Sequence, residues 1–219
     1  MVKITQDASK YAFMPNIILT DCDGVLLNWL KTFDMWMASH GFLKERSDTY
    51  DIALQYGLPP LQADDLVRKF NESAAIGCLE PFDEAYRYLH YLHMEYGFKF
   101  LVITSMSTDP WAGLARRNNL RALFSNTIVD VIFLDHNADK TEVLRPFANT
   151  GLWWIEDKPE NAVAGAQLGL NTILVKHDHN ASSADELANT HGIAICHTWH
   201  EIAQTIVASL EVTHPMSLT

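Results

Sequence analysis

The chain has 219 residues, of which 48% are hydrophobic, and its formal net charge at pH 7 is −11. This length accommodates one sizeable core with a small inserted domain, and the negative charge disfavours binding of a nucleic-acid polymer. Since no apolar run approaches ~20 residues and the first fifteen residues lack a signal-peptide core, we expect no membrane association. The three cysteines form no CxxC pair, which is typical of reduced thiols, so we expect a cytoplasmic protein. We expect this protein to be a monomer or a homodimer.

Two carboxylates follow the first apolar run of the chain. Residues 17–19 predict a buried strand, and Asp21 and Asp23 then fall at its C-terminal end, with Gly24 allowing a sharp turn. In open α/β sheets this edge binds ligands. Cys22 lies between the two acids and should point away from them, because side chains alternate along an extended segment.

Carboxylates this close repel each other unless one is protonated or a cation lies between them. Oxygen ligands favour a divalent metal, and Mg²⁺ is the natural candidate. A calcium loop or an ordinary turn are the alternatives for Asp21 and Asp23. A calcium loop needs further oxygen ligands at set spacing, and residues 25–30 supply none.

Apolar spacing and turn residues predict the other elements. In the helix at 110–119 we expect Trp111, Leu114 and Ala115 to face inward. The elements predicted in chain order are a helix that begins after Gly24 and ends near His40, a helix at 63–70, a helix from Pro81 to Gly97, a strand at 98–104, a helix at 110–119, a strand at 129–134, a helix at 141–147, a strand at 152–155, a helix at 159–168, a strand at 172–175 and a helix at 198–210.

This alternation predicts an α/β fold with a Rossmann-like parallel sheet. About seventy residues separate the first two strands, whereas a crossover needs only ~10–12. We therefore expect a small helical cap at 28–77, inserted after the first strand into a core made of 1–27 and 78–219. A cap there would close over Asp21 and exclude water during chemistry.

Polar residues also follow the later strands. Thr104 and Ser105 could donate hydrogen bonds to a phosphate oxygen, although polar residues are common in any turn that ends a strand. Lys140 could reach the same edge, or could be a solvated surface lysine. Glu156 and Asp157 could supply further metal ligands, or could form a solvated acidic turn, but the apolar residues before them favour a strand buried on both faces.

Two minor features carry less weight. Asp139 is more simply explained as a helix N-cap than as a catalyst. His177 and His179 form an HxH pattern without an evident third ligand, so we assign no zinc site.

Taken together, these motifs resemble those of the haloacid-dehalogenase (HAD) superfamily of aspartate-nucleophile phosphatases. The first motif is residues 21–25, Asp-Cys-Asp-Gly-Val. Thr104 matches the second motif, Lys140 the third, and Glu156 with Asp157 the fourth. The order and spacing together are specific, and the insertion matches the family's helical caps that follow the first motif.

A closer likeness is to the 5′(3′)-deoxyribonucleotidases. It is carried by short stretches such as Thr-Tyr-Asp, Gln-Tyr-Gly and Leu-Glu-Pro, and it is patchy in the cap. Trp29, Tyr50 and Phe70 match aromatic residues that contact the base in those enzymes. Aromatic residues at helical spacing also commonly pack a core, and that alternative stays open.

The resemblance implies a phosphomonoesterase that acts through an aspartyl-phosphate. Asp21 would be the nucleophile and Asp23 the general acid and base. Asp21, the backbone carbonyl of Asp23, Asp157 and Glu156 would hold Mg²⁺, and Glu156 could act directly or through water.

The substrate would be a small phosphorylated metabolite, with a (deoxy)nucleoside monophosphate as the first expectation. Thr104, Ser105 and Lys140 would bind the transferring phosphoryl group. The alternatives are a phosphatase or phosphomutase acting on sugar phosphates or other small metabolites, and a non-catalytic binding protein on the same fold.

Overall fold

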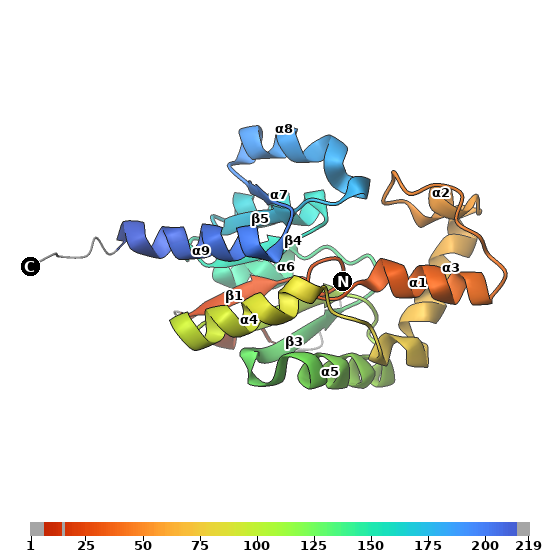
Figure 1. The fold of residues 1–219 in the computed structure, drawn as a ribbon, viewed down its shortest axis with the longest axis horizontal. Coiled ribbons are helices and arrows are strands. Elements are labelled where there is room, and N and C mark those ends of the chain that lie inside the picture. Colours follow the sequence, from red (N-terminus) through yellow and green to blue (C-terminus); the bar gives the residue numbers. More distant parts are fainter. Residues whose placement is uncertain (1–6, 15, 214–219) are drawn as a thin grey trace, which may run out of the picture.

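The computed structural model describes residues 7–14 and 16–213. Its centre is a six-stranded parallel sheet in the order β3-β2-β1-β4-β5-β6, flanked by helices (Figure 1). This confirms the predicted α/β, Rossmann-like fold. The strands are β1 (Ile17–Thr20), β2 (Lys99–Ser105), β3 (Ile128–Leu134), β4 (Trp153–Glu156), β5 (Asn171–Val175) and β6 (Ala194–Cys196).

Helices cover both faces of the sheet, so the central strands β1 and β2 are buried on both sides. Ile18 packs with α4, α5 and α9, whereas Ile17 and Leu19 pack on the opposite face with α6. The helices are α1 (Trp29–Ser39), α2 (Ile52–Tyr56), α3 (Pro60–Asn71), α4 (Asp83–Tyr96), α5 (Pro110–Phe124), α6 (Thr141–Leu144), α7 (Pro159–Gln167), α8 (Ala181–His191) and α9 (Trp199–Thr213).

Helices α1, α2 and α3 fall within residues 28–77 and lie to one side of the sheet, on the right in Figure 1. Aromatic packing holds α1 and α3 together. The rings of Trp29 and Phe33 stack with their centroids 4.5 Å apart, and the ring of Phe70 meets both edge-on. Tyr56 from α2 contacts Phe33 edge-on and donates a hydrogen bond to Asp34. These aromatic contacts pack α1, α2 and α3 together, and the same cluster continues into the core beneath the sheet helices.

The structure corrects several predicted boundaries. Helix α1 begins at Trp29, later than the apolar spacing predicted, because Asn28 caps it by accepting a hydrogen bond from Lys31 N. Helix α8 and strand β6 were not predicted. Strand β6 has only three residues, and α8 packs mainly small residues against α7, so neither carries a strong apolar period.

The inward face of α5 differs from the prediction. Trp111 is 77% exposed and Leu114 is 48% exposed. The buried face carries smaller or polar residues, namely Ala112, Gly113, Arg116, Asn119, Leu120 and Phe124. Gly113 lies beside the ring of Phe133 on β3, where an added Cβ would make an ordinary van der Waals contact at 3.4 Å. The buried face of α5 is therefore not the face that carries Trp111 and Leu114.

Within the described ranges, no helix combines the length and apolar character required to cross a bilayer.

Candidate active site

Asp21 is fixed at the C-terminal end of β1. Its backbone N–H donates to Ile155 O on β4 over 2.8 Å, and the Thr20 hydroxyl donates to Asp21 O over 2.9 Å. The side chain accepts a hydrogen bond from Cys22 N at 2.7 Å. Asp21 is only 7% exposed, so its carboxylate is oriented and largely shielded from water. Cys22 lies in the core, as expected.

Lys140 lies between two carboxylates. Its Nζ is 2.7 Å from Asp21 Oδ1 and 2.9 Å from Glu156 Oε2, and the side chain is 1% exposed. The alternative of a solvated surface lysine is therefore wrong. Burial alone would lower the pKa of Lys140, but the charges of Asp21 and Glu156 outweigh it and raise the pKa. The lysine is thus a fixed positive charge beside Asp21.

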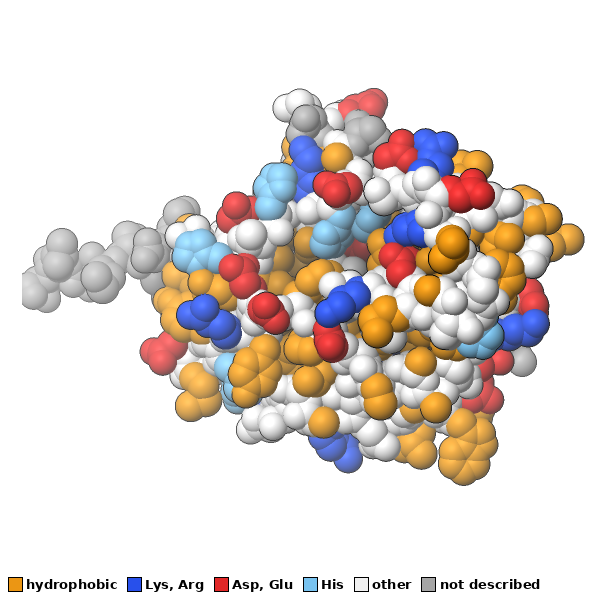
Figure 2. Space-filling model, turned by 45° about the vertical axis from the view of Figure 1, so that its right-hand side comes forward, with side chains coloured by type: hydrophobic (Ala, Val, Ile, Leu, Met, Phe, Trp, Pro, Cys, Tyr) orange, Lys and Arg blue, Asp and Glu red, His pale blue; other side chains and the backbone are white. Residues whose placement is uncertain are grey.

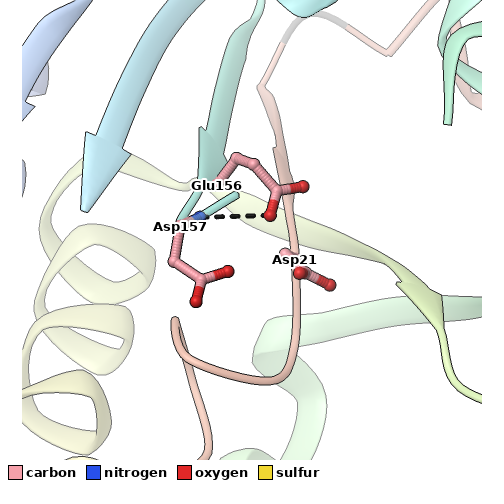
Figure 3. Close-up of side chains that lie close together, drawn as sticks. All are labelled: Asp21, Glu156 and Asp157. Atoms are coloured by element: carbon pink, nitrogen blue, oxygen red, sulfur yellow. Dashed lines mark hydrogen bonds between the residues drawn. The ribbon is translucent and has the colours of Figure 1, made fainter. Parts of the chain in front are cut away.

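Asp21, Glu156 and Asp157 form a buried acidic group at the ends of β1 and β4 (Figure 3). One ligand oxygen from each lies within 4.8 Å of the others. Burial, followed by the charge of Glu156, raises the pKa of Asp21 well above its usual value, and burial with the charge of Asp21 raises the pKa of Asp157 to about 7. With all three ionised, Lys140 leaves two negative charges uncompensated, which one divalent cation would balance.

The donor set fits Mg²⁺ through Asp21 and Asp157. Asp157 Oδ1 is buried without a hydrogen-bond partner among the described residues, which is the state expected of a metal ligand. Glu156 differs, because Oε2 accepts from Lys140 and Oε1 accepts from the backbone nitrogens of Asp157 and Lys158 at 3.1 and 3.0 Å. Glu156 thereby orients the lysine and the turn that carries Asp157.

Gly24 makes room for Asp157. Its φ is +81°, and an added Cβ would overlap Asp157 Oδ2. Its carbonyl is 2.7 Å from His177 Nε2, so the turn is tied to the loop after β5. His179 Nε2 is 3.6 Å from Asp157 Oδ2, which is too long for a hydrogen bond. Because an added Cβ would overlap Asp157, a side chain at position 24 would displace this proposed metal ligand.

Asp23 is held by a residue that the sequence did not reveal. Arg116 on α5 donates through Nη1 to Asp23 Oδ1 and through Nη2 to Oδ2, the latter at 3.4 Å. Arg116 is fully buried, whereas the Asp23 side chain is 22% exposed and lines the cavity beside the acidic group. The small residues Ala112 and Gly113 on the same face of α5 are the sequence signal that could have indicated this inward arginine.

The two predicted hydroxyl residues lie at the end of β2. Thr104 is 1% exposed. Ser105 lines the cavity, and its hydroxyl donates to Ala138 O at 2.8 Å, so it also supports the loop that leads to Lys140. Both residues are near the strand edge that carries Asp21, because Thr20 pairs with Val102. Their role in phosphate binding stays a prediction.

A cavity of about 830 Å³ lies between the cap and the core. Trp29 and Tyr50 line it, and Tyr50 meets the ring of His179 edge-on at 4.9 Å. Phe70 has no exposed surface and packs behind Trp29, so in this arrangement it supports the cavity wall rather than reaching a substrate. Figure 2 shows histidine, basic and acidic side chains mixed on this face of the molecule.

Polar contacts join the cap to the core beside the cavity. Asp64 on α3 lies 2.9 Å from His136 Nε2, and Arg68 lies 3.6 Å from Asp135. On the inner side, Asn71 accepts a hydrogen bond from Trp29 Nε1 and donates to Met106 O at 3.1 Å. These contacts join α1 and α3 to the loops that follow β2 and β3.

No protein-family model matches the chain. An uncharacterised 32.4 kDa protein of enterobacteria phage T4 is 26% identical over 149 residues, which are 60% of this chain and 49% of that protein. The chain thus spans about half the length of the curated relative it matches.

Solved structures share the fold. A predicted phosphatase from Clostridium acetobutylicum aligns over 88% of this chain and 98% of its own, with a TM-score of 0.62 and 17% identity. A haloacid-dehalogenase-like hydrolase from Streptococcus pneumoniae aligns over 87% and 98%, with a TM-score of 0.59 and 15% identity. A D,D-heptose 1,7-bisphosphate phosphatase from B. bronchiseptica, solved with magnesium and phosphate, aligns over 89% and 99%, with a TM-score of 0.55 and 14% identity. The chain therefore has the fold of the haloacid-dehalogenase superfamily.

Proposed function

We propose that the protein is a Mg²⁺-dependent phosphomonoester hydrolase that acts through an aspartyl-phosphate on Asp21. The observation that carries this proposal is the contact of Lys140 with Asp21, beside the buried ligand oxygen of Asp157. It combines an oriented carboxylate, a fixed positive charge and a cation-binding group at one strand edge. The shared fold supports the same class of reaction.

In the first step, an oxygen of Asp21 attacks phosphorus, and the bond from phosphorus to the ester oxygen breaks. Asp23 gives a proton to the departing oxygen. In the second step, water attacks phosphorus while Asp23 takes up its proton, which regenerates Asp21 and releases phosphate. Two easier displacements replace one difficult hydrolysis.

Positive charge is needed where the phosphoryl oxygens develop negative charge. Lys140 supplies one such charge, and the Thr104 hydroxyl would add a hydrogen bond. The Ser105 hydroxyl would do so only after giving up its hydrogen bond to Ala138 O. Asp21, Asp157 and the backbone carbonyl of Asp23 would hold Mg²⁺, which when bound neutralises phosphoryl charge. Glu156 keeps Lys140 in place throughout.

The cavity supports a nucleoside monophosphate as substrate. Among the described residues that line it, those from the cap include Trp29 and Tyr50 but no lysine, arginine or histidine. The basic side chains that line this cavity among the described residues, such as Lys158 and Lys176, come from the core. A second phosphate or a carboxylate on the leaving group would have to reach them there. An uncharged, flat group would gain ~1–3 kcal/mol per aromatic stacking contact.

Gln55 adds a polar feature to this wall. It is 2% exposed and lines the cavity, and its amide nitrogen donates to Thr49 O. Its Oε1 has no hydrogen-bond partner among the described residues. A buried acceptor without a donor is costly, so a substrate that presents an N–H or O–H here would be favoured. Nucleobases and sugars both carry such donors, so Gln55 supports a polar contact here without distinguishing the two substrate classes.

The test is a panel of phosphate esters with and without Mg²⁺. We expect (deoxy)nucleoside monophosphates to have higher kcat/KM than hexose phosphates and sugar bisphosphates. Trp29→Ala should raise KM for nucleotides more than KM for p-nitrophenyl phosphate.

A higher kcat/KM for sugar bisphosphates than for nucleotides would change the proposed assignment from a nucleotidase to a sugar-phosphate phosphatase. If no ester is hydrolysed, the alternative of a non-catalytic binding protein would be favoured over a phosphatase. Equal losses of Trp29→Ala on both substrates, with an unchanged Tm, would remove the base-stacking role.

A further inference from the structure

Arg116 is the only arginine of the described chain that has no exposed surface and also contacts the DxD motif. Its Nη1 donates to Asp23 Oδ1 and lies 3.0 Å from the sulfur of Cys22, while Nη2 is 3.4 Å from Asp23 Oδ2. Its Nε has no partner among the described residues. Asp23 is thus the carboxylate that compensates this buried charge.

Burying the guanidinium of Arg116 costs free energy, which suggests that this residue does more than fill space in the core. Removing a guanidinium from water costs several kcal/mol, and a whole buried ion pair can often be replaced by hydrophobic residues of similar volume without loss of stability. Removing only one partner leaves the other charge unpaired and is destabilising. The neighbours of Arg116 on the buried face of α5 include Ala112 and Leu120, which are compatible with an apolar replacement.

Helix α5 holds the arginine rigidly. Asp109 caps the helix by accepting from Trp111 N and Ala112 N, and Asn119 donates to Leu79 O at 3.1 Å. Gly113 lies beside the ring of Phe133 on β3. A side chain on such a scaffold keeps a fixed geometry. The guanidinium therefore defines where the carboxylate of Asp23 can lie.

We propose that Arg116 is a positioning residue that orients Asp23 for proton transfer to and from the ester oxygen and the attacking water. The proposal rests on the proposed function. The close contact fixes Oδ1, and the longer contact leaves Oδ2 as the oxygen that gives its proton when the bond to the ester oxygen breaks. Oδ2 then takes a proton from water when the aspartyl-phosphate is hydrolysed. Arg116 itself touches neither the phosphoryl group nor the leaving group.

The test uses leaving groups that differ in their need for a proton. A nucleoside 5′-monophosphate releases an alkoxide-like oxygen, which needs general-acid help. 2,4-Dinitrophenyl phosphate releases a stabilised phenolate, which does not. The parameter kcat/KM reports the steps up to phosphorylation of Asp21, so slow hydrolysis of the aspartyl-phosphate does not obscure the comparison.

We expect R116M to lower kcat/KM for the nucleotide by ~10²-fold, the scale of general acid catalysis, and for dinitrophenyl phosphate by less than about threefold. D23N should show the same pattern, and R116M should add little further loss in the D23N background because both remove one function. Arg117→Met is the matched control, since Arg117 is the next residue on α5 but pairs with Asp130 at 2.6 Å. It should leave the ratio of the two kcat/KM values unchanged.

Equal losses on both substrates with R116M would overturn the proposal, because a purely structural role lowers both alike. If R116M does not fold, R116K decides: a loss selective for the nucleotide supports the proposal, and no selectivity overturns it. A wild-type protein that hydrolyses neither ester would overturn the proposed function as well, whereas an active wild type with unselective variants would overturn only the role of Arg116.

Discussion

The side-chain nitrogen of Lys140 lies 2.7 Å from Oδ1 of Asp21, and this contact joins the loop after β3 to the end of β1. Both groups are almost fully buried. The attraction stabilises the ionised forms of both, although burial opposes them. Glu156 adds a second carboxylate at 2.9 Å, so the lysine balances one of two negative charges.

Lys140→Met should abolish detectable phosphatase activity and lower the free energy of unfolding by about 3–5 kcal/mol, the cost of leaving buried charges unpaired. The loss should be smaller at pH 5 than at pH 8, because the remaining carboxylates can take up protons. Urea unfolding at the two pH values measures it. Lys69→Met is the control, since the Lys69 side chain is 61% exposed and pairs with the exposed carboxylate of Asp65. Similar unfolding midpoints for Lys140→Met and wild type would contradict the buried pairing.

Asp21→Asn should lower kcat by several orders of magnitude while the fold stays intact, because the covalent route is lost. Without metal, its Tm should equal or exceed that of wild type. Burial and the charge of Glu156 raise the pKa of Asp21, so the ionised carboxylate is unfavourable in the folded protein and its removal relieves repulsion. Steady-state kinetics and thermal unfolding in EDTA check both parts. Near-normal turnover, with wild-type contamination excluded, would refute the role as nucleophile.

Mg²⁺ should raise the Tm of the wild-type protein, and EDTA should abolish activity. Binding at 100 times the Kd stabilises a protein by about 2.7 kcal/mol. Asp157→Asn should remove most of this increase, because Asp157 supplies a buried oxygen that has no hydrogen-bond partner in the described part of the chain. Thermal unfolding with graded Mg²⁺ measures the effect without substrate. Full activity in excess EDTA would refute the metal requirement.

Gly24→Ala should destroy the Mg²⁺-dependent increase in Tm. Gly24 has φ +81°, and its added Cβ would overlap Asp157 Oδ2. Gly41→Ala provides a matched control, since Gly41 has φ +85° but no atom within 4 Å of an added Cβ. Both substitutions carry the same backbone strain, so the difference between them isolates the overlap with Asp157. An unchanged Mg²⁺ response in Gly24→Ala would mean that Asp157 does not bind the metal.

Asp130→Asn should lower the free energy of unfolding by about 1.5–3 kcal/mol near pH 7, the value of hydrogen bonds to a charged group. Burial alone would raise the pKa of Asp130, but hydrogen bonds from Tyr11 and Arg117 outweigh it and lower the pKa. Tyr11 donates at 2.7 Å and so ties the segment before β1 to β3.

A carboxylate whose pKa is lowered by folding stabilises the folded state above its unfolded pKa, about 3.9. The stabilisation is lost as the pH falls through the lower folded value. The gap between wild type and Asp130→Asn should therefore be full above about pH 5 and should close below pH 4. Denaturant unfolding across this range measures it, and a gap that stays constant down to pH 3 would contradict the prediction.

The sequence predicted the parts of the molecule that depend on local patterns. Five strands agree with the structure to within one residue at each end, because short apolar runs between turn residues are distinctive. The acidic residues after β1 and β4 were found because parallel strands bring their carboxyl ends together. By contrast, α8 and β6 were missed because their burial depends on packing against α7 and β5.

Arg116 shows a different limit. An arginine in an amphipathic helix is usually solvated, and the large apolar residues Trp111 and Leu114 favoured the wrong face of α5. Only the tertiary contact with Asp23 reveals why a charge lies inside. Likewise, Phe70 was expected beside the substrate, and the packing of the cap places it behind Trp29.

The pairing of β1 has a consequence for how the protein acquires its folded state. Strand β1 precedes the cap, and both strands that pair with it, β2 and β4, follow the cap in the chain. Long-range parallel pairing closes large loops and is slow compared with helix formation. Strand β1 therefore cannot complete its pairing until β4 has been synthesised, long after α1, α2 and α3. A chain that ends before β4 would contain Asp21, the proposed nucleophile, but would lack Glu156 and Asp157.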